Sequence, residues 1–121
     1  MSSLTFTKSC SFNEVNKAVE WWSSKMSCVP QQNIWIFKQN LEGLIYLRIH
    51  KHWYLDNPSK GSGYRSIIND HHTDPILLHA CNAAQIHPSK LPKDCVLVLS
   101  PGIVRVRSLA TEIEQVIYQI N

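Results

Sequence analysis

Apolar residues recur with the period of an α-helix in two stretches of the first half of the chain. The first stretch starts at the polar residues 11–13 and should end near residues 28–30, and its apolar positions share one helix face: Val15, Val19, Trp22 and Met26. The second runs from residue 31 to about residue 53 and keeps the period for about five turns, with Ile34, Phe37, Leu41, Ile45 and Ile49. Only a short turn separates them, so we expect an antiparallel helical hairpin.

The second half alternates turn signals with short apolar runs. Residues 56–63 are dense in Asp, Asn, Pro, Ser and Gly, which predicts a loop that leads into a strand at residues 64–68. Asp74 followed by Pro75 is a typical helix start and predicts a third helix from residue 75 to about residue 86. Residues 95–99, 103–107 and 115–120 have the composition and length of strands.

Together these elements predict an α/β fold of the α+β type. The N-terminal antiparallel helical hairpin should pack with a small, about four-stranded, mainly antiparallel sheet and one further helix. The chain has 121 residues, of which 44% are hydrophobic and 17% charged, and this composition is typical of a single folded core. No repeat or linker composition interrupts it, so we expect one domain over residues 1–121, with residues 1–12 as an N-terminal extension.

Charge and cysteine usage bear on location and partners. The net charge of +3 is too small to indicate nucleic-acid or membrane binding by itself. We find neither a signal-like N-terminus nor a membrane-length apolar run, so we expect no membrane partner and a cytoplasmic or nuclear location. The four cysteines are widely spaced. Reduced, mostly buried thiols fit this pattern better than a disulfide or a metal site.

Motifs that carry catalysis are missing from the sequence. The residues 61–63, Gly-Ser-Gly, precede a predicted strand rather than a helix, so they match neither a nucleophile elbow nor a phosphate-binding loop. His50 and His52 lie two residues apart on a predicted helix and point about 200° from each other, which prevents them from sharing an ion. We therefore expect no enzyme activity, no catalytic residue, no metal and no cofactor.

Two surfaces are candidates for binding. Arg105 and Arg107 share one face of a predicted strand and are candidate RNA contacts, although a merely solvated outer face explains them more simply. On the second helix, Trp35, Tyr46 and Leu47 fall outside the core stripe. They form a candidate surface for self-association or a second partner. Cover by residues 1–12, which contain Leu4, Phe6 and Phe12, and plain exposure are the alternatives.

One segment carries a family resemblance. Residues 51–67 read KHWYLDNPSKGSGYRSI, and His52-Trp53 with the unbroken residues 58–65 resembles the first signature box of the BTG/Tob anti-proliferative family. The order of elements around the box is similar to the family's from about residue 13 to residue 120. The resemblance implies the family's fold and a non-enzymatic adaptor that binds the catalytic deadenylase subunit of the CCR-NOT complex, regulates mRNA poly(A) shortening and restrains cell proliferation.

The resemblance also implies a binding surface, which this chain alters. It places Tyr64 and Asp74 in the deadenylase contact, together with the second box. There the family's usual L-W-V-D-P reads Leu-Val-Leu-Ser-Pro, so that Val98, Ser100 and Pro101 hold the contact positions. Losing the tryptophan and the aspartate should cost roughly 3.5 to 5 kcal/mol of binding free energy. The alternative is a divergent member that has lost this docking and acts by self-association or by binding RNA or another protein.

Overall fold

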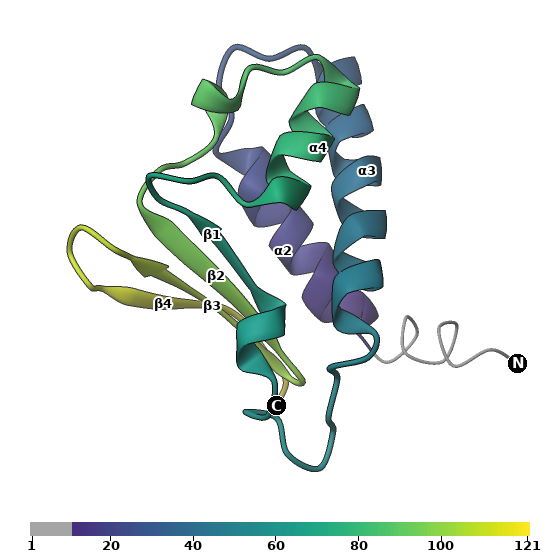
Figure 1. Ribbon diagram of the computed structural model, residues 1–121, viewed down its shortest axis with the longest axis vertical. Coiled ribbons are helices and arrows are strands. Elements are labelled where there is room, and N and C mark those ends of the chain that lie inside the picture. The colour runs from purple at the N-terminus through teal and green to yellow at the C-terminus, as the bar shows by residue number, and fades with distance from the viewer. Residues whose placement is uncertain (1–10) are drawn as a thin grey trace, which may run out of the picture.

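The computed structural model describes residues 11–121. Three α-helices lie on one side of a four-stranded sheet (Figure 1). In chain order the elements are α2 (Phe12–Ser24), α3 (Gln31–Ile49), the 3-10 helix η1 (Ser62–Arg65), β1 (Ser66–Asn69), α4 (Pro75–Ala84), the 3-10 helix η2 (Pro88–Lys90), β2 (Cys95–Ser100), β3 (Ile103–Ser108) and β4 (Glu114–Gln119). The predicted fold class is confirmed. Of the residues expected in the N-terminal extension, Ser11 is fully buried and Phe12 is the first residue of α2, and residues 1–10 lie outside the described part of the chain.

The sheet is antiparallel throughout, with the strand order β1-β2-β3-β4. Because side chains alternate between the faces of a strand, each strand sends one set of residues toward the helices and the other set away from them. The inward set is buried and includes Ile67, Leu97, Leu99, Val104 and Val106. The opposite set forms a face that the helices do not cover, and we call it the outer face.

Helix periodicity explains the core on the inner side of the sheet. The faces of α2 and α3 that were predicted to be apolar carry fully or almost fully buried residues: Val15, Val19, Trp22, Phe37, Leu41, Ile45 and Ile49. Helix α4 begins at Pro75 because the Asp74 side chain accepts a hydrogen bond from the Ile76 N–H at 3.0 Å. It ends at Ala84, where Gln85 takes a left-handed φ of 56°.

Two predicted elements have different bounds in the structure. Helix α3 ends at Ile49, about one turn early, and a tight turn follows in which the His52 N–H donates to the Ile49 carbonyl at 2.8 Å. The predicted strand at residues 64–68 begins only at Ser66. Gly61 adopts a φ of 73° and its carbonyl accepts from the Tyr64 N–H, so residues 62–65 coil into η1. Both differences bring His52 and Tyr64 together.

Candidate partner-binding surface

A buried arginine organises the segment that carries the family resemblance. Arg65 is fully buried, and its guanidinium donates to the carbonyls of Pro58 at 2.6 Å and Lys60 at 2.8 Å. It also donates to the Leu99 carbonyl and to the Ser100 Oγ at 3.0 Å. Burial lowers the pKa of this guanidinium. All four acceptors are uncharged, so Arg65 ties the loop at residues 58–60 to the end of β2 without a counterion among the described residues.

Tyr64 is the most exposed aromatic side chain of this segment. The residue is 60% exposed, and its ring lies face to face with the imidazole of His52, with ring centroids 3.8 Å apart and planes inclined by 3°. Stacking of this kind contributes about 0.5 to 1.5 kcal/mol and fixes the ring's orientation. The adjacent Arg65 fixes the backbone. Tyr64 is therefore held in place by its neighbours, and one ring face and the hydroxyl group remain available to a partner.

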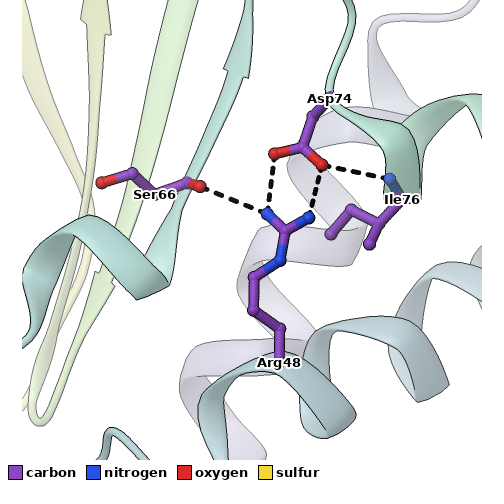
Figure 2. Close-up of polar contacts among 4 residues, drawn as sticks. All are labelled: Arg48, Ser66, Asp74 and Ile76. Carbon is purple, nitrogen blue, oxygen red and sulfur yellow. Dashed lines mark hydrogen bonds and ion pairs between the residues drawn. The ribbon is translucent and has the colours of Figure 1, made fainter.

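The Asp74 side chain bonds to other residues of the domain. Figure 2 shows its carboxylate facing the guanidinium of Arg48, with two hydrogen bonds of 2.7 and 2.6 Å. One carboxylate oxygen also caps α4 at Ile76, and the side chain is only 9% exposed. Arg48 reaches the Ser66 carbonyl at 3.4 Å as well. Asp74 thus joins α3, α4 and the edge of β1, and any part it takes in binding acts mainly through the position of its neighbours.

The two predicted contact residues of β2 lie in different environments. Val98 is half-buried on the outer face, where it pairs with Ser66 of β1 and Arg105 of β3. Ser100 is only 7% exposed and accepts the hydrogen bond from Arg65. Val98 is therefore available to a partner, whereas the Ser100 side chain mainly holds Arg65.

Pro101 lies in the turn between β2 and β3. The next residue, Gly102, has a φ of 84°, and its N–H donates to the buried carboxylate of Glu14 at 2.8 Å. A Cβ at Gly102 would come within 2.8 Å of the Ile120 side chain. This turn is held from both sides, so Pro101 occupies a fixed position beside the end of β2.

Arg105 and Arg107 point away from the helices, as the strand pattern predicts. Both are exposed on the outer face, and Arg105 Nε lies 3.6 Å from the Glu114 carboxylate. Together with Ser59, Ser62, Val96, Val98 and Ser100 they line a hollow of about 280 Å³. The structure thus brings the arginines beside Val98 and Ser100, which the sequence reasoning had assigned to a separate surface.

The predicted patch on α3 needs a correction. Trp35 and Leu47 are 62% and 61% exposed, but Tyr46 is only 4% exposed and belongs to the core. Burial and the nearby carboxylates of Glu42 and Glu14 raise the pKa of Tyr46 to about 12. Glu14 is part of α2, which therefore covers this flank of α3. Trp35 and Leu47 lie 12 positions apart, which is about 18 Å along a helix, and without Tyr46 they do not form one continuous surface.

The cysteines of the described residues differ in exposure. Cys81 and Cys95 are buried, which raises the pKa of each thiol to about 11, so both stay protonated near neutral pH. Two of the three described thiols are thus buried, in line with the expectation of mostly buried thiols, whereas Cys28 is exposed; Cys10 lies outside the described residues. Across residues 11–121, no three His, Cys, Asp or Glu side chains gather as metal ligands, and no helix has the length and apolarity to cross a membrane.

Sequence reasoning missed three residues that shape this surface: Arg48, His52 and Arg65. Arg48 lies in the last turn of α3 and donates to the Ser66 carbonyl of β1, whereas His52 lies beyond the helix end and reaches Tyr64 through the turn after Ile49. Arg65 lies inside the recognised segment, but its acceptors on β2 are 34 and 35 residues away in the sequence. Only the folded chain shows what it holds.

The fold first defines a class of protein. The structure resembles the solved BTG/Tob domain of C. elegans FOG-3 with a TM-score of 0.82, and the match covers 91% of each chain at 22% sequence identity. At that identity the likeness concerns the fold. The arrangement of helices and sheet is that of a BTG/Tob domain.

Sequence comparison then gives the family. A family model described as "BTG family" matches residues 11–118. Human Protein BTG2 is 34% identical over 103 residues, covering 78% of this chain and 64% of that protein. A BTG family protein of Dictyostelium discoideum is 30% identical over 115 residues, covering 89% of this chain and 27% of that protein. The chain belongs to the BTG family, whose members are anti-proliferative regulators of the adaptor type, and it spans less than two thirds of these relatives.

Proposed function

We propose that this domain is a non-enzymatic adaptor that binds the catalytic deadenylase subunit of the CCR-NOT complex. Through that contact it regulates poly(A) shortening of mRNA and restrains proliferation. The observation that carries the proposal is the exposed Tyr64 ring, held by His52 and Arg65 inside the family's first box. Val98 and Pro101 border the same end of the sheet. Free thiols at Cys28, Cys81 and Cys95 support a location in the cytoplasm or nucleus.

Val98 and Ser100, which replace the tryptophan and the aspartate of the family's second box, have different surroundings. Val98 is on the outer face, so a Val98→Trp substitution would present a large aromatic group to a partner. A Ser100→Asp substitution would place its carboxylate against Arg65. We therefore expect Val98→Trp to account for most of any gain in deadenylase binding, and Ser100→Asp to act mainly on the stability of the loop.

A pull-down with the purified deadenylase subunit tests the proposal. Wild type, Tyr64→Ala, Val98→Trp and the double variant Val98→Trp with Ser100→Asp would be compared. Ile113→Ala is the matched control, because Ile113 is 69% exposed in the β3–β4 connection. The proposal predicts binding that Tyr64→Ala removes, Val98→Trp strengthens and Ile113→Ala leaves unchanged. Failure of the wild type to bind would refute it, and binding by the double variant alone would show that the changes at residues 98 and 100 have removed the docking.

A second candidate rests on the exposed Leu47. It borders an open hollow of about 420 Å³ on α3, whose other lining residues are Gln39, Asn40, Gly43, Leu44, Tyr46 and His79. A divergent member could use this region for self-association. Sedimentation of wild type against Leu47→Ser tests this function, and Tyr46 is left intact because it is buried. A wild type that remains monomeric at high concentration would rule out the self-association version.

A further inference from the structure

Apolar and positively charged side chains occupy different strands on the outer face of the sheet. Strand pairing creates two rows of side chains across it. In one row Ile68 pairs with Val96 and Val96 with Arg107, and in the next row Ser66 pairs with Val98 and Val98 with Arg105. Directly paired side chains on neighbouring strands are about 5 Å apart. Each row thus changes within two strand spacings, about 10 Å, from small or apolar groups at β1 to a guanidinium at β3.

The side chains at the two ends of the first row are accessible. Ile68 is 39% exposed, and Arg107 is exposed and forms no ion pair with any described residue. Between them Val96 is buried and contributes to the lining of the hollow. An exposed apolar side chain and a guanidinium with free donors therefore flank the buried Val96.

The polar side chains that line the hollow carry three hydroxyl groups, two guanidinium groups and one carboxylate. The Ser100 hydroxyl accepts from Arg65, which leaves its own proton free to donate. The single carboxylate in the lining, that of Glu114, lies beside Arg105 rather than Arg107. Since Arg107 offers a planar set of donors that suits a carboxylate, the charge of the hollow is complementary to an acidic side chain.

We infer that the outer face binds a protein segment in which an apolar side chain neighbours an acidic one. The apolar group packs on Ile68 and Val98, and the carboxylate pairs with Arg107. This inference rests on the proposed docking function, because Val98 and Ser100 border both surfaces. It adds the chemistry of the segment that the partner must supply.

Charge reversal in the complex is the first test. The deadenylase subunit would be titrated by calorimetry into wild type, Arg107→Glu, Arg107→Lys and Lys25→Glu. Lys25 caps α2 on the helix side of the sheet and is the matched control. We expect Arg107→Glu to weaken binding at least tenfold, Arg107→Lys to weaken it less, and Lys25→Glu to leave it unchanged. Thermal unfolding of each variant checks that it folds.

A second test does not depend on the deadenylase. The ¹⁵N-labelled domain would be titrated with a heptapeptide alternating leucine and aspartate, with its asparagine counterpart, and with a short oligoadenylate. Amide shifts at Val96, Val98 and Arg107 with the aspartate peptide alone would support the inference. Shifts there with oligoadenylate and not with the peptide would overturn it in favour of RNA.

The two proposals fail in different ways. If the subunit binds wild type and Arg107→Glu equally, the inference is wrong and the docking function stands. If the subunit binds no variant, the docking function fails, and the peptide titration alone decides the chemistry of the outer face. An outer face that responds to neither the peptide nor the subunit overturns the inference.

Discussion

Replacing Arg65 by methionine should destabilise the domain by about 3 kcal/mol. The substitution keeps much of the side-chain volume but removes every donor. Two of the four acceptors, the Leu99 carbonyl and the Ser100 hydroxyl, are in a buried environment. Each costs about 1 to 3 kcal/mol when left without a partner. The carbonyls of Pro58 and Lys60 belong to exposed residues and can bond to water, so they add little.

Urea unfolding followed by circular dichroism measures this loss directly. The matched control is Arg105→Met, which removes an exposed arginine whose ion pair with Glu114 contributes about 0 to 1 kcal/mol. We expect a change in the free energy of unfolding several times larger for Arg65→Met than for the control. A loss below about 1 kcal/mol, or one equal to that of Arg105→Met, would refute the role assigned to Arg65.

Three further predictions concern stability and reactivity. Asp74→Asn keeps an acceptor for the helix cap but loses the ion pair with Arg48, so it should lower the free energy of unfolding in urea by about 1.5 to 3 kcal/mol. Asp74→Ala also removes the cap and should cost about 1 kcal/mol more. Equal losses for the two variants would show that the carboxylate is not the cap. In a Cys10→Ser background, a colorimetric thiol reagent should modify the exposed Cys28 quickly and the buried Cys81 only on unfolding, and fast reaction of Cys81 would contradict its burial. Because burial raises the pKa of Cys81 to about 11, its contribution to stability is complete below the unfolded value near 9 and is lost as the pH rises through 11; a free energy of unfolding that does not fall between pH 9 and 11 would contradict this.

Much of the fold could be predicted because it depends on local periodicity. The apolar stripe from Phe37 to Ile49 and the alternation at residues 103–107 directly indicate which residues face the core. The helix cap at Asp74 depends on two neighbouring residues, so it could also be predicted from the sequence. Element ends were less predictable, because the left-handed Gly61 and the turn after Ile49 depend on how the chain returns to the sheet.

The candidate surface was predicted only in part, since it is built from long-range contacts. A helical wheel measures angles around one helix and cannot show that α2 covers the flank of α3 that carries Tyr46. Likewise, Ser100 was compared with the family's aspartate as a contact residue, whereas its neighbour in space is Arg65. Tyr64 was assigned to the partner contact by the family resemblance alone, and its 60% exposure follows from the turn at Gly61 and the 3-10 helix η1.

Calorimetric titration of the deadenylase subunit into the domain measures whether the exposed Tyr64 ring is the docking contact. Wild type, Tyr64→Phe and Tyr64→Ala would be measured side by side. Tyr64→Phe retains the stack on His52 and loses only the hydroxyl, whereas Tyr64→Ala loses the exposed ring. We predict saturable binding by wild type, weaker binding by Tyr64→Phe and none by Tyr64→Ala. Binding of equal strength by wild type and Tyr64→Ala, or no heat with wild type at all, would contradict it.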